Sequence, residues 1–293
     1  MATTVTVARG RAAWLQDVRD RTRRLRLPWI PVFIVTVLIL CALFAPLLAP
    51  HDPTLISMLD AKIAPFEDMK YILGTDIMGR DMLSRLIYGA RSAMFMSVVA
   101  LGTGAFVGTV LGLVAGYRGG WVDALVMRTA DAALGFPTIL VAMIIVVLMG
   151  AGIEIIILAV ALTVWARFSR MIRGDVLSIK ELDFVTAAKI AGVTTPVIIW
   201  RHIFPNTINT LMVITSLQVG QVILLEASLS FLGLGLPVGA PAWGIMVAEG
   251  RTVILDVWWL SLLPGLAITV VVLAFNFFGD WMRDSLDPKL RRV

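Results

Sequence analysis

Residues 93–116, AMFMSVVALGTGAFVGTVLGLVAG, carry no charged side chain and are long enough to cross a bilayer as one helix, which takes about 20 apolar residues. Gly104, Gly108, Gly112 and Gly116 recur at every fourth position. This spacing places them on one helix face. Because small residues let helices approach closely, the face predicts packing against another helix, with a smooth pore wall as the alternative. The stretch therefore predicts a helical bundle inside a membrane.

Composition extends this prediction to the whole chain. Hydrophobic residues make up 59% of it, charged residues only 15%, and the mean hydropathy is +0.90, whereas soluble domains are about a quarter charged. Six apolar runs predict six spanning helices at residues 29–48, 93–116, 134–149, 153–168, 208–225 and 258–278. The middle three are the shortest of the six and are expected inside the bundle. The fold class is thus an all-α integral membrane protein.

The distribution of basic residues predicts the orientation in the membrane. Most of the 25 Lys and Arg fall in the tail 1–28, in the short loop after the second run, after the fourth run and near the tail 284–293. Positive residues favour the cytoplasmic side, so both termini of this multi-pass cell-membrane protein are expected there. The tail 1–28 either lies on the inner leaflet as an amphipathic helix or is solvated. The net charge of +5 then requires no nucleic-acid partner, because membrane lipids also attract basic segments.

Polar side chains are scarce within the six runs. Apart from Glu154 and Arg167 near the ends of the fourth run, these runs lack Asp, Glu, Lys and Arg, whereas proton-coupled transporters and voltage sensors usually need such charges. The remaining polar candidates are Gln218, Gln221, Glu226 and Asn276. These residues either hydrogen-bond between helices or line a translocation path for a polar solute.

The polar segment 183–205, between the fourth and fifth runs, predicts a docking site for another protein. A glycine at 192 and a proline at 196 predict two short helices that meet at an elbow, the second ending at Pro205. Small side chains would let a partner's backbone approach, with positive charge at the rim. The residues expected at the contact are Thr186, Ala187, Ala188, Lys189, Gly192, Arg201, His202 and Pro205. A solvated loop that merely joins two spans is the alternative.

Motifs for catalysis or nucleotide binding are absent from the sequence. The chain has no HExxH, GxSxG or GxxxxGK[ST], and its two histidines, His51 and His202, are expected on opposite sides of the membrane. Cys41 is the single cysteine, which excludes an internal disulfide and a cysteine-based metal cluster. We therefore predict no catalytic site, metal or cofactor in this chain, and any ATP must be hydrolysed by a separate subunit.

The segment 49–91 is expected on the outer side of the membrane. Met82, Leu83, Leu86 and Ile87 fall on one helical face, which predicts an amphipathic helix in the outer interface. This helix either braces the second span or contacts an extracellular solute-binding protein, together with the loop 226–258.

Several sequence blocks stand in order between about residues 28 and 290. The blocks are Gly74-Thr75-Asp76, Gly79-Arg80-Asp81, residues 83–91, residues 119–123, Phe136-Pro137, residues 226–235, Phe275-Asn276, Gly279-Asp280 and Arg283-Asp284. Together they resemble the C-type permease subunits of bacterial dipeptide and oligopeptide ABC importers. Within this resemblance, segment 183–205 corresponds to the coupling loop, with Thr186 in place of the usual glutamate. Residues 92–283 correspond to a type I ABC importer transmembrane domain.

The resemblance implies partners as well as a fold. The coupling loop would insert into a cleft on an ATP-binding cassette subunit, one or two of which would carry ATP and Mg. The other implied partners are a second homologous permease in a heterodimer, an extracellular or periplasmic peptide-binding protein, and membrane lipids. Permeases of nickel-chelate importers are similar and remain an alternative. A stand-alone channel or secondary carrier is more distant, because the sequence shows no inverted repeat.

Overall fold

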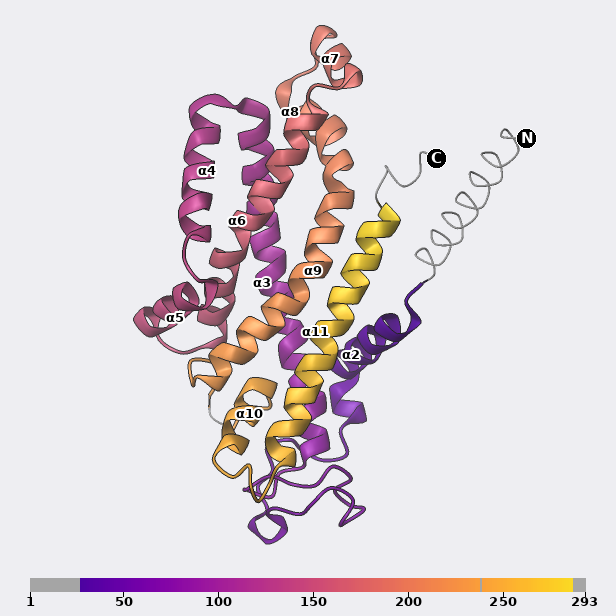
Figure 1. The fold of residues 1–293 in the computed structure, drawn as a ribbon, viewed down its shortest axis with the longest axis vertical. Helices are drawn as coiled ribbons and strands as arrows, with labels where there is room; N and C mark the ends of the chain where they lie inside the picture. Colours follow the sequence, from indigo (N-terminus) through magenta and orange to yellow (C-terminus); the bar gives the residue numbers. More distant parts are fainter. Residues whose placement is uncertain (1–26, 238, 287–293) are drawn as a thin grey trace, which may run out of the picture.

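The computed structural model describes residues 27–237 and 239–286, and its regular secondary structure there is helical (Figure 1). The tail 1–28 and the tail 284–293 fall largely outside these residues. The helices are α2 (Trp29–Leu48), η1 (Met58–Asp60), α3 (Met82–Arg118), α4 (Gly120–Leu134), α5 (Thr138–Met149), α6 (Ile153–Ile179), α7 (Asp183–Ile190), α8 (Thr195–Val197), η2 (Ile198–Ile203), α9 (Phe204–Phe231), α10 (Trp243–Arg251) and α11 (Trp259–Leu286). Helix α7 lies at one end of the bundle, and α10 lies near the other, beside residues 49–81 (Figure 1).

Helix α3 runs through the centre of the bundle as one unbroken element of 37 residues. The side chain of Asp81 caps its start by accepting hydrogen bonds from the backbone N–H groups of Leu83 and Ser84. At 1.5 Å per residue α3 is about 55 Å long, well beyond the hydrocarbon core of about 30 Å. The prediction of a separate interfacial helix before the second span is therefore wrong. Its residues form the first turns of α3, since Gly89 packs against Trp243 instead of breaking the helix.

The predicted third span, residues 134–149, is also not one straight helix. Helix α4 ends at Leu134 and α5 begins at Thr138, and their axes meet at 90°. Pro137 explains the break, because proline disfavours helical backbone in the residue before it, here Phe136. Helix α5 has only 12 residues, or about 18 Å, and cannot cross a bilayer alone.

Three other helices extend beyond their predicted runs. Helix α6 continues from the fourth run to Ile179, so Arg167 lies in its middle and not near its end. Helix α9 covers the fifth run and continues to Phe231, which places Glu226 within the helix. Helix α11 ends at Leu286, past the sixth run. Charged residues mark where the apolar runs end but do not stop a helix, because Arg and Glu are good helix formers.

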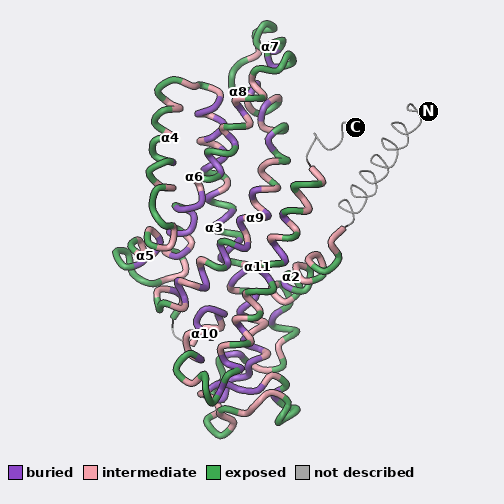
Figure 2. Tube along the Cα trace, viewed as in Figure 1, coloured by how far each residue is buried: buried purple, intermediate pink, exposed green. Residues whose placement is uncertain are grey.

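Among the described residues, five helices are long and apolar enough to span a membrane, or six if the bent pair α4 and α5 counts as one span. The chain is therefore a multi-pass helical membrane protein. Helix α2 is the most peripheral of the five, with 11% of its apolar window buried, whereas α3 and α6 are about half buried. Figure 2 shows this contrast between exposed outer helices and the buried centre.

The glycine ridge of α3 lies against α6. All four glycines are buried, and a Cβ added at Gly108 would lie 2.3 Å from the backbone oxygen of Trp165. At Gly112 it would lie 2.7 Å from the oxygen of Ser169, and at Gly116 2.8 Å from Cβ of Val176. The absence of side chains on this face therefore sets how closely the two central helices pack.

Candidate functional site

The elbow between α7 and α8 is built on a Schellman turn. The N–H of Val193 donates to the carbonyl of Ala188 at 3.1 Å, and the N–H of Gly192 donates to that of Lys189 at 3.1 Å. Gly192 has φ +74°, a left-handed conformation that glycine adopts without strain. These bonds satisfy the last carbonyls of α7, so the elbow is an ordered turn.

One face of α7 anchors the elbow and another is exposed. Val185 and Ala188 are buried in an apolar cluster with Ile172, Ile198 and Ile203. The predicted close approach of a partner at Ala188 is therefore corrected: its methyl group holds α7 against the bundle. The predicted contact residues that are exposed are Thr186, Ala187, Lys189, Gly192, Arg201 and Pro205.

The second limb of the elbow continues directly into a spanning helix. Residues Thr195–Phe231 form one continuous helical span, with the π-helical segment η2 just before α9. Pro205 lies in the first turn of α9, directly after the π-helical segment η2, and does not end the helical span. The prediction that Pro205 stops the second limb is thus wrong. The ring of the half-buried His202 lies 6.3 Å from that of Phe184, which links this limb to α7.

Ion pairs fasten α4 to α6 at the α7 end of the bundle. Arg173 donates through Nε and Nη2 to both carboxylate oxygens of Asp123, at 2.5 and 2.6 Å. Arg170 pairs with Asp131, one helical turn further along. Bidentate pairs of this kind fix orientation as well as distance, so α4 is held in register along α6.

The four polar residues proposed to line a path have different surroundings. Gln218 is 8% exposed, and its side-chain oxygen accepts a hydrogen bond from Nη1 of Arg167 at 3.1 Å. Gln221 is exposed and Asn276 is half-buried. Glu226 is 3% exposed and accepts a hydrogen bond from Ser230 of its own helix at 2.8 Å. The structure therefore brings Gln218 to an arginine and encloses Glu226 within the bundle.

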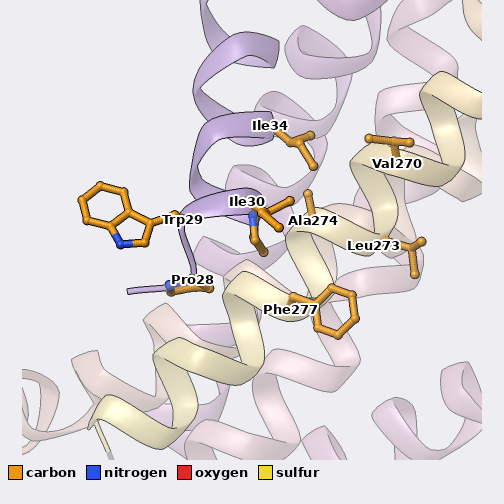
Figure 3. A pocket seen from close by; sticks show the side chains of 9 residues that line it. Pro28, Trp29, Ile30, Ile34, Val270, Leu273, Ala274 and Phe277 are labelled. Carbon is orange, nitrogen blue, oxygen red and sulfur yellow. The ribbon is translucent and has the colours of Figure 1, made fainter. Parts of the chain in front are cut away.

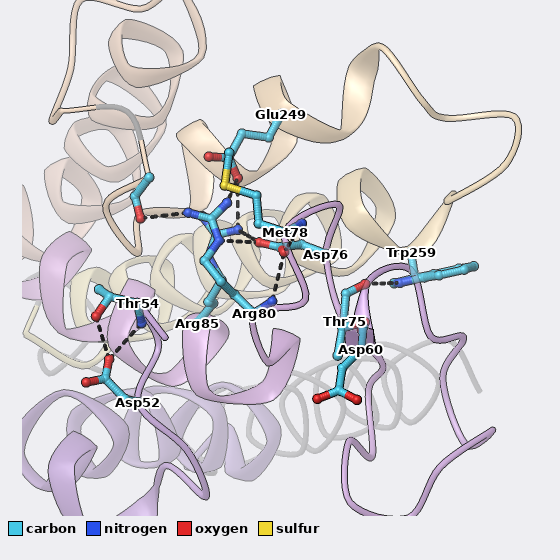
Figure 4. Close-up of polar contacts among 11 residues, drawn as sticks. Asp52, Thr54, Asp60, Thr75, Asp76, Met78, Arg80, Arg85, Glu249 and Trp259 are labelled. Carbon is cyan, nitrogen blue, oxygen red and sulfur yellow. Dashed lines mark hydrogen bonds and ion pairs between the residues drawn. The ribbon is translucent and has the colours of Figure 1, made fainter. Parts of the chain in front are cut away.

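A buried charged cluster lies at the α10 end, and sequence reasoning missed it (Figure 4). One carboxylate oxygen of Asp76 accepts from Nε of Arg80 at 2.5 Å and from Nη1 of Arg85 at 2.6 Å. Glu249 on α10 accepts from the same two arginines at 3.0 and 2.8 Å. Asp76 and Arg85 are fully buried. The loop before α3, α3 itself and α10 are thus joined through charge.

Two tryptophans and an aspartate add hydrogen bonds at the α10 end of the bundle. The indole N–H of Trp243 donates to the carbonyl of Leu86 at 3.0 Å, and that of Trp259 donates to the carbonyl of Thr75 at 3.0 Å (Figure 4). Hydrogen bonds from Ser57 and Tyr71 hold the pKa of the Asp60 carboxyl below its usual value. The signal available in the sequence was three closely spaced charges, at 76, 80 and 85, beside an apolar run.

A pocket of about 660 Å³ lies between the start of α2 and α11 (Figure 3). Its lining is apolar and includes Trp29, Ile34, Leu273 and Phe277. It opens between peripheral helices and lacks the polar side chains that would accompany a peptide. Among the described residues, no group of three His, Cys, Asp or Glu side chains is placed to hold a metal ion.

The described residues thus form a multi-pass helical membrane protein with an exposed, ordered elbow at one end. Comparison with known protein families identifies the family to which this chain belongs. Residues 108–292 match the family of binding-protein-dependent transport system inner membrane components, and residues 13–66 match the N-terminal transmembrane domain of oligopeptide transport permease C. The chain belongs to the first of these families.

Individual relatives cover nearly the whole chain. The dipeptide transport system permease protein DppC of Bacillus subtilis is 38% identical over 98% of this chain and 89% of its own length. The glutathione transport system permease protein GsiD of Pectobacterium atrosepticum is 38% identical over 88% of this chain and 85% of its own length. The oligopeptide transport system permease protein OppC of B. subtilis is 34% identical over 94% and 90%.

Proposed function

We propose that this chain is a membrane-spanning permease subunit of an ATP-driven, binding-protein-dependent importer of dipeptides and oligopeptides. The observation that carries the proposal is the α7–α8 elbow, an exposed and ordered turn whose second limb runs unbroken into α9. A partner that moved the elbow would move this spanning helix. The relatives are permeases for dipeptide, oligopeptide and glutathione transport, which supports a peptide as the solute.

In this proposal the chain itself catalyses no reaction. One or two separate cassette subunits bind ATP and Mg and contact the exposed elbow residues at 186, 187, 189, 192, 201 and 205. ATP-driven closure of the cassettes displaces the elbow, and α9 carries that displacement into the bundle and favours one of two access states. A second homologous permease completes the path, and a binding protein delivers peptide to the α10 end.

The proposed orientation places the α7 end in the cytoplasm, together with both termini. Lys180, Lys189 and Arg201 lie on or beside the elements of that end, where the positive-inside bias favours them. At the α10 end, Arg80 and Arg85 are neutralised within the buried cluster. The asymmetry of basic charge therefore favours a cell-membrane protein with its elbow inside.

The test is purification of the chain from detergent-solubilised native membranes, with identification of co-purifying proteins and assay of ATPase activity with added peptides. We expect a second permease, one or two cassette proteins and a peptide-binding protein, with ATPase activity stimulated by di- to pentapeptides. Stimulation by nickel chelates in place of peptides would move the assignment to that alternative. Recovery of the chain alone, with transport in liposomes, would support a self-sufficient carrier and contradict the proposal.

A further inference from the structure

Three arginines recur at three-residue intervals along α6, and one of them differs from the other two. Arg170 and Arg173 each pair with an aspartate of α4, namely Asp131 and Asp123. Arg167 instead hydrogen-bonds to Gln218, a neutral amide on α9, at 3.1 Å. Its charge is therefore oriented but not compensated by this contact.

The position of Arg167 makes this charge unusual. Arg167 lies at the end of the apolar run 153–168 of α6, Gln218 lies within the apolar run 208–225 of α9, and the arginine side chain is exposed at the surface of the chain. Among the described residues, no Asp or Glu oxygen lies within 4.0 Å of it. Charged side chains at membrane depth are costly, and they face a water-filled path or a partner in place of lipid. The contact between Arg167 and Gln218 therefore marks a polar surface where α6 leaves its apolar run.

Gln218 holds the guanidinium group in a defined position. It is 8% exposed and accepts through its oxygen from one Nη1 N–H of Arg167. A guanidinium group has five N–H donors in a planar fork. The donors that remain suit a carboxylate, which arginine binds through two parallel hydrogen bonds. Gln221, exposed one turn further along α9, adds an amide near the same surface.

We infer that Arg167, positioned by Gln218, binds the terminal α-carboxylate of a peptide during its passage through the membrane. This inference rests on the proposed peptide-import function and adds a contact residue to it. Every linear peptide with a free carboxyl end carries this group, whatever its side chains, so one arginine serves many sequences. An acidic residue of the second permease is the competing occupant, and the test distinguishes the two.

The experiment compares a dipeptide with the same dipeptide whose carboxyl end is amidated. Uptake is measured in proteoliposomes that contain the complete complex, with wild-type Arg167 or with Arg167→Gln. The ratio of uptake of acid to amide is compared between the two complexes, so that the preference of the binding protein cancels. Only the dipeptide with a free carboxylate can form a hydrogen-bonded ion pair with Arg167, and Arg167→Gln removes that pair. We therefore expect this variant to lower the ratio of acid to amide uptake about tenfold.

Two further variants separate recognition from folding. Arg170→Gln removes a neighbouring charge that pairs with Asp131 and should lower uptake of both solutes equally. Arg167→Lys keeps the charge without the planar fork and should give an intermediate ratio. An unchanged ratio in Arg167→Gln, with or without loss of total uptake, would overturn the inference and favour pairing with the second permease. A wild-type complex that transports neither solute would instead overturn the proposed function, and this inference with it.

Discussion

At the scale of single residues, missing side chains determine how closely α3 and α6 pack. The four glycines of α3 lie against backbone and Cβ atoms of α6, and these atoms cannot move without shifting the helix. Gly102, on the same helix, has no atom within 4 Å of its added Cβ and is exposed. The helix thus contains its own comparison between a packed and an open glycine.

Replacing Gly108 with leucine should separate the two central helices. The new Cβ would lie 2.3 Å from the oxygen of Trp165 and 2.7 Å from Cβ of Phe168, and overpacking of this kind costs about 1–3 kcal/mol or more. We expect a lower melting temperature and a lower yield of detergent-solubilised protein. Gly102→Leu is the matched control and should leave both unchanged. Equal loss in both variants would mean that leucine harms insertion generally.

Substitutions at Gly192 test the role of the elbow, again at the scale of one residue. Valine strains at the positive φ of this position, at a cost of about 1–3 kcal/mol, whereas asparagine tolerates it. We expect Gly192→Val to reduce uptake per ATP hydrolysed while membrane insertion stays normal, and Gly192→Asn to remain close to wild type. Both are measured as the ratio of solute uptake to ATPase activity in the reconstituted complex. Normal coupling in Gly192→Val would contradict the assignment of the elbow as the cassette contact.

At the scale of elements, the α10 end of the bundle depends on charges that join distant parts of the chain. Breaking a buried ion pair by removing one partner costs about 3–5 kcal/mol, because the other charge remains buried. The Glu249 side chain is 13% exposed, and glutamine would keep one acceptor. The expected cost of Glu249→Gln is therefore somewhat smaller, at about 2 kcal/mol.

Glu249→Gln should loosen α10 without disturbing the other end of the bundle. Two guanidinium groups would share the single carboxylate of Asp76, so we expect faster hydrogen exchange of α10 amides and unchanged exchange in α7. Asp256→Asn, at an exposed position near α10, is the control and should leave exchange as in wild type. Slow exchange of α10 in both variants would show that packing of Trp243 is sufficient to hold this helix.

Elements differ in how far the sequence predicts them. The bounds of α2 match the predicted run, because its ends coincide with prolines and with the change from apolar to polar residues. The ends of α6 and α9 were missed, since hydropathy reports where lipid stops and not where a helix stops. The bend between α4 and α5 had a visible signal in Pro137, but the apolar run continued across it. The ion cluster joins residues more than 160 positions apart, and such a pairing cannot be read from local spacing.

At the scale of the whole molecule, the two ends of the bundle differ in chemistry. The α7 end presents arginines and lysines beside an exposed elbow. The α10 end buries its arginines and exposes apolar residues such as Leu59 and Leu255, at 99% and 95%. The sequence predicts where the elbow lies. It does not predict that the second limb continues into α9, because Pro205 suggests the end of a helix.

The proposed orientation predicts that the α7 end is cytoplasmic and the α10 end faces the outside, and one labelling experiment checks this. In a background with Cys41→Ala, cysteine is placed at Ile190, 83% exposed at the α7 end, or at Leu255. A membrane-impermeant maleimide added to intact cells should label Leu255→Cys, and should label Ile190→Cys only after permeabilisation. Labelling in the reverse pattern would invert the proposed orientation and remove the elbow from any cytoplasmic cassette.

The buried cluster also has a consequence for the biogenesis of the chain. Arg80 and Arg85 are synthesised 164 or more residues before Glu249, their second carboxylate partner. At about 5–20 residues per second, roughly ten to thirty seconds separate their synthesis from its arrival. During that interval one aspartate must balance two arginines. Closure of the cluster thus reports that the chain has been made as far as α10, and a chain truncated before Glu249 would leave the two arginines with one carboxylate between them.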